Sequence, residues 1–553
     1  MKILILGGYG VFGGRLAELL ADISGLEIVI CGRSLARAKA FCAAWRGQAR
    51  VTALQISRDE IRLGLAAERP ALLVDASGPF QDYGDDPYSV VEACITSGVD
   101  YLDFADAADF VFGVSRFDAA AKAAGIFVLS GASSFPVLTA AVLRQMAKTM
   151  DIQSVEGGIA PSPYAGIGLN VMRAVVGYAG SPVKLLRNGV QTHAPGLTES
   201  RRFTIAVPGR MPLKNTRFSL VDVPDLQVIP PEHATLTDIW MGAGPVPESL
   251  HRILNLLAKA RAAFGLPSLS PLSGLFYKVL NLAKFGEHRG GMFVRARGWK
   301  NHKPAEQTWH LLAEGDDGPY IPSMAIEAII RKLLDGNRPA AGAGPATNAL
   351  ELADYERLFQ ARSIHMGLRG AVSQTDPMYQ RVLGAAFETL PDQLKAFHGA
   401  TEPRAWEGRA QVRRGSGVIA RSIAGLIGFP AAGADVPVRV TLSPEQGGER
   451  WVRNFDGQIF SSVQRAGTDR NEYLIVESFG VVSVAVALVV EGRKLFLVPR
   501  KWWCCGLSLP KWLLPAGRAI EAEQEGRFLF DVEIVLPLIG LIVAYRGTLR
   551  PVS

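Results

Sequence analysis

Near its start the chain carries Lys2-Ile3-Leu4-Ile5-Leu6, followed at once by Gly7-Gly8-Tyr9-Gly10-Val11-Phe12-Gly13. The first five residues have the length and apolar composition of a buried strand. The glycines at 8, 10 and 13 have the spacing G-x-G-x-x-G, and apolar residues follow at helical spacing at Leu16, Leu19 and Leu20. A strand, a glycine-rich turn and a helix in this order predict the first βαβ unit of a dinucleotide-binding domain.

Short apolar runs alternate with helical patterns from this unit to about residue 147. The runs lie at 27–31, 71–74, 101–104 and 126–129. Such alternation is typical of a parallel sheet covered by helices on both faces. We therefore predict an α/β fold for residues 1–147, with a Rossmann-like, doubly wound parallel sheet.

The three spaced glycines each have a physical reason in a dinucleotide site. Gly8 permits the tight turn, Gly10 lets the backbone approach a pyrophosphate, and Gly13 allows close packing of the helix. The helix that starts here presents free N–H groups and the positive end of its dipole to the phosphates. A glycine-rich turn that binds nothing is the alternative. We expect the intervening residues to contact the cofactor as well: Tyr9, Val11 and Phe12.

The residues after the second strand distinguish NADP(H) from NAD(H). An NAD site places Asp or Glu there to accept hydrogen bonds from the ribose 2′-hydroxyl. This chain has Arg33 and Ser34 instead, with Arg37 one helical turn further on. A guanidinium pairs with a 2′-phosphate through two hydrogen bonds, whereas a carboxylate would repel it. The sequence therefore predicts NADP(H), with a solvated arginine at a helix start as the alternative.

A second turn follows the predicted strand at 71–74. Its sequence is Asp75-Ala76-Ser77-Gly78-Pro79-Phe80, and it lies at the carboxyl edge of the sheet, where the cofactor crevice of such a fold is found. Gly-Pro fixes the turn so that its backbone can lie along the nicotinamide half of the cofactor. A simple loop is the alternative. We expect contacts to the cofactor from Asp75, Ser77, Gly78 and Pro79.

Two side chains near this edge are candidates for the proton transfer that usually accompanies hydride transfer. Asp103 lies in the predicted strand at 101–104, with Asp106 close behind it. Asp103 would handle a proton or orient the substrate, and the alternative is a carboxylate that caps the next helix. Tyr83 follows the Gly-Pro-Phe turn and would contact substrate or cofactor.

The remainder of the chain changes character twice. Residues 148–360 combine alternating strand patterns with helices and a small-residue loop at 340–346, which predicts an inserted α+β domain that closes over the crevice. The chain is expected to return to the first domain near 320–360. Residues 361–375 have the composition of a linker. Residues 376–553 show successive strand patterns separated by glycine-containing turns, which predicts a mainly antiparallel β domain, a curved sheet or barrel.

Composition excludes several classes of protein. The net charge of +7 is spread over 553 residues without a basic block, so we expect no nucleic-acid partner. The five cysteines lack metal-ligand spacing, and no metalloprotease motif is present, so we expect no metal site. No apolar stretch has the length of a spanning helix, and the strand pattern starting at Lys2 leaves no room for a signal peptide. The cysteine usage fits a reducing cytoplasm best. A homo-oligomer is one alternative for the assembly of the chain.

The motifs occur in the order found in one protein family. The segments that carry the likeness are Gly8–Gly13, Gly32–Ser34, Asp75–Phe80, Ala93-Cys94, Gly98–Asp103 and Pro319–Met324. They resemble the NAD(P)-binding part of saccharopine-dehydrogenase-like proteins, over about residues 1–360. The resemblance implies a Rossmann fold with an inserted, partly antiparallel second domain, and often oxidation or reduction at a carbon–nitrogen bond.

Two departures bear on this resemblance. The loop 130–136, Ser-Gly-Ala-Ser-Ser-Phe-Pro, lacks the acidic residue that often contacts substrate in the relatives. No motif identifies arginines for the carboxylates of an amino-diacid, so saccharopine is not expected as the substrate. The tail from about 376 is similar to a bacterial domain of unknown function, with Arg450-Trp451 and Gly526-Arg527-Phe528 as its most recognisable parts.

The sequence favours an NADP(H)-dependent oxidoreductase that acts on a small molecule. Two features suggest an apolar or lipid-like substrate: the Leu- and Ala-containing stretch 250–285 with its five basic side chains, and the apolar strands and Trp502-Trp503 of the tail. The stretch 250–285 also suits a pair of helices that contact a membrane surface, with packing against the protein's own sheet as the alternative. The rival hypothesis is a non-catalytic dinucleotide-binding sensor or scaffold with a ligand-binding tail.

Overall fold

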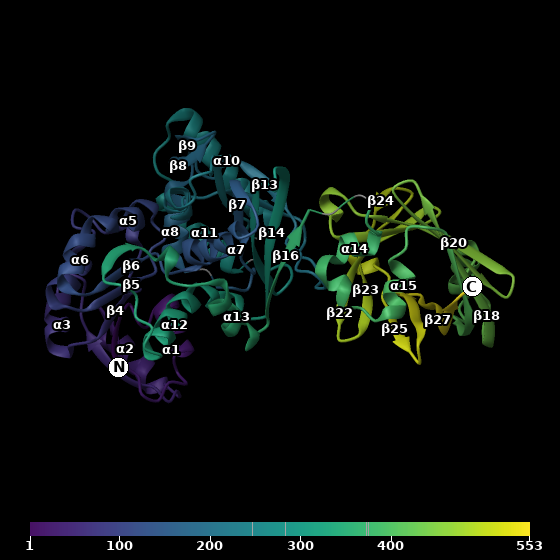
Figure 1. The fold of residues 1–553 in the computed structure, drawn as a ribbon, viewed down its shortest axis with the longest axis horizontal. Helices are drawn as coiled ribbons and strands as arrows, with labels where there is room; N and C mark the ends of the chain where they lie inside the picture. Colours follow the sequence, from purple (N-terminus) through teal and green to yellow (C-terminus); the bar gives the residue numbers. More distant parts are fainter. Residues whose placement is uncertain (167, 246, 283, 372, 374, 553) are drawn as a thin grey trace. The chain divides into compact units, whose positions relative to one another are not determined.

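The computed structural model describes residues 1–552 except 167, 246, 283, 372 and 374. Two compact units form within the chain (Figure 1). The first comprises Met1–Phe203 and Thr216–His365, and the second comprises Thr204–Asn215 and Met366–Ser553. The segment 204–215 therefore belongs to the second unit by its contacts, although the sequence pattern assigned it to the middle domain.

A seven-stranded sheet forms the centre of the amino-terminal part of the first unit. Its strand order is β15-β6-β5-β4-β1-β2-β3, and the strands pair in parallel. Ile3, Leu4 and Ile5 of the central strand are completely buried, as in sheets covered on both faces. The predicted Rossmann-like sheet is confirmed. The strands are β1 (Lys2–Leu6), β2 (Glu27–Gly32), β3 (Arg50–Gln55), β4 (Leu72–Asp75), β5 (Asp100–Asp103), β6 (Phe127–Ser130) and β15 (Gly342–Pro345).

Helices connect the strands of this sheet and begin where the apolar runs end. Ser34 caps the second helix, because its hydroxyl accepts a hydrogen bond from the N–H of Arg37 at 3.4 Å. The strand order changes direction at β1, which has β2 on one side and β4 on the other, and ligands of such sheets bind beyond the strand ends at this point. The helices are α1 (Val11–Leu19), α2 (Leu35–Ala44), α3 (Ile61–Glu68), α4 (Ser89–Ser97), α5 (Ala108–Gly113), α6 (Asp118–Ala124) and α7 (Thr139–Ala147).

The chain comes back to this sheet after the second one. Helix α12 (Ile321–Leu334) packs against α1, and Arg331 of α12 forms an ion pair with Asp22 at 2.9 Å. Strand β15 then pairs with β6 at the edge of the first sheet, and α13 (Leu352–Gln360) follows. The small residues at 340–346, expected to form a loop, thus include a short parallel strand.

A second sheet, formed mostly by strands of the first unit, is mixed. Its order is β10-β11-β12-β7-β13-β14-β16, with β12 and β7 parallel and the long hairpin β13–β14 antiparallel. Strand β16 lies within the predicted linker 361–375, of which Val372 and Gln374 are outside the described residues. The strands are β7 (Asp151–Ala160), β10 (Ser200–Phe203), β11 (Thr216–Leu220), β12 (Asp238–Ala243), β13 (Arg289–Lys300), β14 (Lys303–Glu314) and β16 (Ile364–Gly370).

Three helices of the first unit share one small apolar cluster. Leu254 of α10, Phe276 of α11 and both Met172 and Val176 of α8 are buried in it. A separate hairpin lies in the same part of the unit, and its strands β8 and β9 are antiparallel. The elements are α8 (Leu169–Tyr178), β8 (Pro182–Arg187), β9 (Val190–Pro195), α9 (Asp225–Val228), α10 (Glu248–Phe264) and α11 (Ser273–Leu282).

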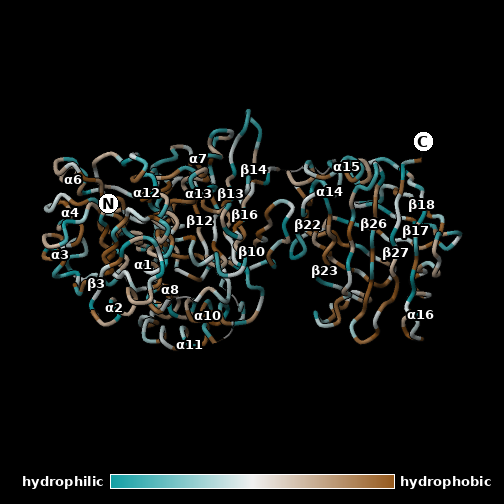
Figure 2. Tube along the Cα trace, turned by 90° about the horizontal axis from the view of Figure 1, so that it is seen from below, coloured by the Kyte–Doolittle hydropathy of each residue, from teal (hydrophilic) through white to brown (hydrophobic). Residues whose placement is uncertain are grey.

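Ten antiparallel strands close into a barrel in the second unit. The sheet runs β22-β21-β20-β19-β18-β17-β27-β26-β25-β23, with β24 beyond it, and pairing of β22 with β23 closes the ring. Figure 2 shows hydrophobic segments along its strands, among them β26 and β27. The predicted antiparallel β domain is confirmed. The strands are β17 (Arg404–Arg414), β18 (Gly433–Glu445), β19 (Gly448–Phe455), β20 (Gln458–Ala466), β21 (Leu474–Phe479), β22 (Val482–Glu491), β23 (Lys494–Cys504), β24 (Leu507–Ser508), β25 (Ala519–Gln524), β26 (Arg527–Leu536) and β27 (Gly540–Pro551).

Helices and one inserted segment complete the second unit. The helices are α14 (Met378–Leu383), α15 (Asp392–His398) and α16 (Val418–Ile427). The inserted segment 204–215 is held through its backbone carbonyls: the N–H of Val490 donates to the carbonyl of Gly209 at 2.8 Å, and the guanidinium of Arg369 donates to the carbonyl of Ala206 at 2.7 Å. Within the part of the chain that the structure describes, no helix has both the length and the apolar character needed to cross a bilayer.

Candidate functional site

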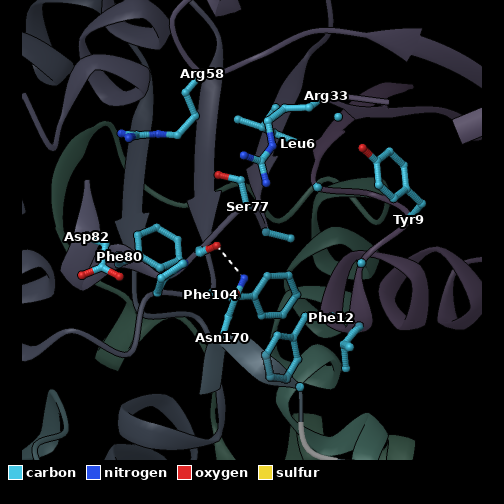
Figure 3. Close-up of a pocket in the computed structure, with 18 of the residues that line it drawn as sticks. Leu6, Tyr9, Phe12, Arg33, Arg58, Ser77, Phe80, Asp82, Phe104 and Asn170 are labelled. Atoms are coloured by element: carbon cyan, nitrogen blue, oxygen red, sulfur yellow. Dashed lines mark hydrogen bonds between the residues drawn. The ribbon is translucent and has the colours of Figure 1, made fainter. Parts of the chain in front are cut away.

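A cavity of about 960 Å³ opens at the carboxyl ends of strands β1 to β5 (Figure 3). Its size is that of sites for cofactors and drug-sized ligands. Five successive strand-to-helix loops contribute to its wall, and α8 adds a side from beyond the first domain. The main lining residues are Tyr9, Gly10, Val11, Phe12, Arg33, Ser34, Arg37, Arg58, Ser77, Gly78, Pro79, Tyr83, Phe104, Asp106 and Asn170.

The turn after β1 depends on Gly7 more than on Gly8. Gly7 has a positive φ of 81°, and a Cβ there would lie 2.6 Å from the backbone oxygen of Ala76. Gly8 instead packs closely, since its Cβ would lie 2.9 Å from the oxygen of Ile5 and 3.2 Å from Cα of Ile30. The tight turn predicted at Gly8 therefore has its left-handed residue at Gly7, one position earlier.

The last glycine of the motif brings α1 close to the turn. A Cβ on Gly13 would lie 2.6 Å from the oxygen of Gly7. Gly10 is the residue before the helix, and no side chain caps it. The first N–H groups of α1 consequently face the cavity beside Gly10, Val11 and Phe12, which line it. This is the donor set that binds a pyrophosphate in dinucleotide sites.

The side chains after β2 form a basic rim on the same cavity. The backbone N–H of Ser34 donates to the Tyr9 hydroxyl at 3.0 Å, and the guanidinium of Arg37 lies 4.8 Å from the centre of the Tyr9 ring. Arg33 extends into the cavity (Figure 3) and is exposed. Residues 32–37 include no Asp or Glu. The rim therefore fits a 2′-phosphate and lacks the carboxylate that would bind a free ribose hydroxyl.

A hydrogen-bonded group of three side chains lies below the turn after β4. Asp75 is completely buried and does not line the cavity, and its Oδ1 accepts hydrogen bonds from the N–H of Ser77 at 2.9 Å and from Oγ of Ser77 at 2.6 Å. Oγ of Ser77 is 2.9 Å from the hydroxyl of Tyr83. Ser77 and Tyr83 both line the cavity. Asp75 thus holds the turn, and Ser77 and Tyr83 are the members that a ligand can reach.

The protonation states of this group follow from its burial. Burial raises the pKa of the Asp75 carboxyl, against the opposing effect of its hydrogen bonds from Ser77. Burial, followed by the nearby Asp75, raises the pKa of Tyr83 far above its ordinary value. The Tyr83 phenol therefore keeps its proton across the physiological range and can donate a hydrogen bond.

Asp103 lies behind the cavity wall, and Asp106 lies in it. Asp103 is completely buried and accepts hydrogen bonds from Oγ of Ser130 at 2.7 Å, the N–H of Gly131 at 2.6 Å and the N–H of Ala105 at 2.9 Å. Burial raises its pKa to about 7. These partners tie the ends of β5 and β6 together. Asp106 lines the cavity and accepts a hydrogen bond from Gln81 at 3.1 Å.

Three lining residues have no motif in the sequence. The guanidinium of Arg58 lies 3.3 Å from the centre of the Tyr83 ring and donates to the carbonyl of Pro87 at 3.0 Å. Phe104 stacks on Phe12 with ring centres 5.6 Å apart. Asn170 of α8 donates to the carbonyl of Gly78 at 2.8 Å, as the dashed line in Figure 3 shows. Of these three positions, only Arg58 has a feature that the local sequence shows, a basic residue shortly after the third strand.

An apolar side cavity of about 190 Å³ adjoins the first one. The two share Val11, Phe12, Gly168 and Val171 in their walls. Arg15 is the charged residue in the described lining, and its guanidinium already donates to the carbonyls of Pro319 at 3.1 Å and Ala165 at 3.2 Å. The other lining residues include Ile159, Ala160, Met292, Leu311, Ala313, Ile321 and several glycines.

Two family models match separate parts of the chain. Residues 3–129 match the saccharopine dehydrogenase NADP binding domain, and residues 390–549 match a domain of unknown function, DUF4166. Both resemblances inferred from the sequence are thereby confirmed. Among curated proteins, none matches this sequence. The first match supports an oxidoreductase of the dehydrogenase type that uses a nicotinamide dinucleotide.

Solved structures with a related fold are distant in sequence. Apo saccharopine dehydrogenase (L-Glu forming) from Saccharomyces cerevisiae is 12% identical, covers 67% of this chain and 100% of its own length, and has a TM-score of 0.47. Amine dehydrogenase from Mycobacterium smegmatis is also 12% identical, with 64% and 96% covered and a TM-score of 0.32. An engineered D-amino acid dehydrogenase bound to NADP+ is 12% identical, with 63% and 93% covered and a TM-score of 0.31.

Proposed function

We propose that the protein is an NADP(H)-dependent oxidoreductase whose cofactor binds in the large cavity of the first unit. The observation that carries the proposal is the pairing of an uncapped α1 amino terminus with a basic rim free of carboxylates at 32–37. Backbone N–H groups at Val11 and Phe12 would bind the pyrophosphate, since the N–H of Gly10 already donates to the carbonyl of Gly7 at 2.8 Å. Arg33, with Ser34 and Arg37, would bind the 2′-phosphate.

The turn at Ser77–Pro79 would then border the nicotinamide half of the cofactor, which supplies or accepts a hydride when bound. Tyr83 is our candidate hydrogen-bond donor to the substrate, because its neutral hydroxyl lies at the cavity wall, 2.9 Å from Oγ of Ser77. For Asp103 we propose a positioning role, since its carboxyl is enclosed by the ends of β5 and β6. Substitution of Asp103 should alter the pH dependence of turnover more than the Kd of the coenzyme.

The substrate that this arrangement favours is apolar in the part that enters the side cavity. The walls there are mostly apolar, and the guanidinium of Arg15 is already bonded to two backbone carbonyls. A substrate carboxylate would lose its hydration without gaining a partner. An amino-diacid such as saccharopine is therefore a poor candidate.

All five cysteines are free, so we expect the protein to work in a reducing compartment, the cytoplasm.

Titration of the purified chain with NADPH and NADH tests the proposal. We expect NADPH to bind more tightly, and Arg33→Ala to raise its Kd at least roughly tenfold while leaving the Kd of NADH almost unchanged. Lys39→Ala is the matched control, because Lys39 is an exposed cation of α2, the helix that follows Arg33, and lies outside the cavity. Equal effects of Arg33→Ala on both coenzymes would contradict the assignment of the 2′-phosphate.

Turnover distinguishes the enzyme from a dinucleotide-binding sensor. NADPH oxidation should be followed over imines, ketones and enones with apolar substituents of increasing length. We expect Tyr83→Phe to lower kcat while NADPH still binds, because the substitution removes only a hydroxyl. Tight NADPH binding without oxidation of any substrate in this series would favour the sensor.

A further inference from the structure

The outer faces of α10 and α11 carry an unusual concentration of exposed apolar side chains. Single exposed apolar residues are ordinary on soluble proteins, but a contiguous group marks an interaction site. The exposed fraction reaches 84% at Leu282 and 79% at Phe264. Nine large apolar residues between 253 and 285 are exposed: Ile253, Leu256, Phe264, Leu266, Leu272, Leu275, Val279, Leu282 and Phe285.

Packing inside the first unit does not account for this face. The two helices turn other residues inward, with Leu254 and Ala258 of α10 and Phe276 of α11 buried against α8. On α11 the exposed residues Leu275, Val279 and Leu282 have the helical spacing i, i+4, i+7, so they share a stripe opposite the buried one. The helices are therefore apolar on two sides, and the protein's own core uses one.

The charges in this segment have one sign. Residues 253–285 include Lys259, Arg261, Lys278 and Lys284 and no Asp or Glu. Arg261 donates to the carbonyls of Gly177 and Ala179, whereas the three lysines are exposed among the apolar residues. Lysines interleaved with exposed leucines and phenylalanines are typical of helices that lie in the interface of an anionic membrane. Two copies of the same surface would bring like charges together.

We propose that this segment, the α10–α11 surface (residues 253–285), docks on the surface of an anionic phospholipid bilayer. Its described residues exclude 283. Figure 2 shows α10 and α11 along the lower edge of the first unit, where a flat partner can approach both helices. The apolar side chains would enter the headgroup region, and Lys259, Lys278 and Lys284 would contact lipid phosphates.

The position of this surface relates it to the proposed substrate site. Pro161, Ser162 and Gly166 line the apolar side cavity, and they also line a small recess whose other wall includes Leu280 and Asn281 of α11. An apolar substrate dissolved in the bilayer would thus enter beside α11. This second step rests on the proposed function, whereas the docking itself does not.

Co-sedimentation of the full chain with vesicles tests the docking. We expect binding to phosphatidylcholine vesicles that contain phosphatidylglycerol, and much weaker binding to phosphatidylcholine alone or at high salt. The triple variant Leu256→Ser, Leu275→Ser, Leu282→Ser should reduce the partition coefficient at least roughly tenfold. Lys259→Gln and Lys278→Gln should each reduce it roughly fivefold.

A matched control lies on the second unit. Val418, Ile419 and Leu426 of α16 are also exposed, and their triple substitution by Ser should leave vesicle binding unchanged. Absence of binding by the unaltered chain, or an equal loss in the α16 variant, would overturn the proposal. So would loss of a dimer in the α10–α11 variant without any vesicle binding, since a second copy would then be the partner. The Kd of NADPH, measured on the same samples, should not change and reports separately on the proposed function.

Discussion

Both units have a buried apolar core, but they use their interiors differently. The first unit leaves a cavity of about 960 Å³ at the end of its parallel sheet, bordered by glycines and by the open end of α1. The core of the second unit includes a cluster of packed aromatic rings. Phe397 lies 4.0 Å from Phe528, 5.1 Å from Trp406 and 5.4 Å from Trp451, measured between ring centres.

The coenzyme site that we propose lies in the first unit, whereas the cavity of about 540 Å³ in the second unit is lined by polar and charged residues such as Glu407, Arg409 and Arg439. The suggestion that Trp502 and Trp503 indicate an apolar substrate has no support in the contacts of Trp503, which packs on a small cluster with Leu474, Ala485 and Ala487. We expect changes in the barrel to alter stability and changes near the glycine turn to alter coenzyme affinity. The following predictions separate these two effects.

Truncation of an aromatic side chain in the core of the second unit should have the largest effect on stability. Phe397 is 1% exposed, and Phe397→Ala would leave a cavity among the surrounding rings. We expect the free energy of unfolding of the second unit to fall by about 3–5 kcal/mol, measured by calorimetry or hydrogen exchange. The Kd of NADPH should stay within the error of the titration. A clear loss of affinity would show that the barrel core is coupled to the cavity.

The pH dependence of the first unit should report on Asp103. Burial raises its folded-state pKa to about 7, above the value of about 3.9 in an unfolded chain. The folded state therefore holds the proton between about pH 4 and 7, and the free energy of unfolding falls as the pH rises through that window, by up to about 4 kcal/mol.

Asp103→Asn tests the direction of this pH dependence, because an amide resembles the protonated carboxyl in shape. We expect the variant to lose part of the fall in melting temperature between pH 4 and 7 and to be the more stable form at pH 7. A melting temperature that falls equally steeply in both proteins would mean that other buried carboxyls cause the dependence. Asp225, whose pKa burial also raises to about 7, would be the next residue to substitute.

The glycine turn should tolerate a methyl group poorly. Gly7→Ala places Cβ against the backbone oxygen of Ala76 in a residue with positive φ, which costs about 1–3 kcal/mol. The turn would shift, and the Kd of NADPH should rise with it. Gly98→Ala is the control, since Gly98 has a φ of 65° and open space around its Cβ position. An equal loss of affinity in the control would show that strain anywhere in the sheet has the same effect.

The central part of the fold could be predicted from the sequence because its strands are buried on both faces. The predicted strand at 2–6 coincides with β1, and those at 27–31 and 71–74 differ from β2 and β4 by one residue at their ends. Strand β3 was missed because it lies at an edge and is only partly buried. The strand β15 was missed because Gly342–Pro345 has the composition of a turn, and its pairing with β6 is a long-range contact.

The site was predictable where it is local in the sequence. Tyr9, Gly10 and Arg33 follow strands that can be recognised by pattern, and strand ends meet at one edge of a parallel sheet. The local sequence does not show in which direction a side chain points at that edge. It therefore favours Asp103 as the candidate catalyst, although Asp103 is bonded in the interior and Asp106 is the one that lines the cavity. Asn170 lies on α8, after the first domain, and only the tertiary fold brings it to Gly78.

Asn170 gives the smallest and most specific test of the comparison. Its amide holds the carbonyl of Gly78, so Asn170→Ala should loosen the turn at the proposed nicotinamide half and raise the Kd of NADPH roughly fivefold, the value of one hydrogen bond. Asn281→Ala removes an amide of the same unit that donates to the carbonyl of Tyr277 at 3.0 Å, outside the large cavity, and should leave the Kd unchanged. Among the described residues, none that lines this cavity belongs to the barrel. The Phe397 and Asn170 substitutions should therefore act independently, and their effects on stability and affinity should add. A double variant, Phe397→Ala with Asn170→Ala, whose affinity falls well below that of Asn170→Ala alone would show that the second unit acts on the cofactor site and does more than bury its own core.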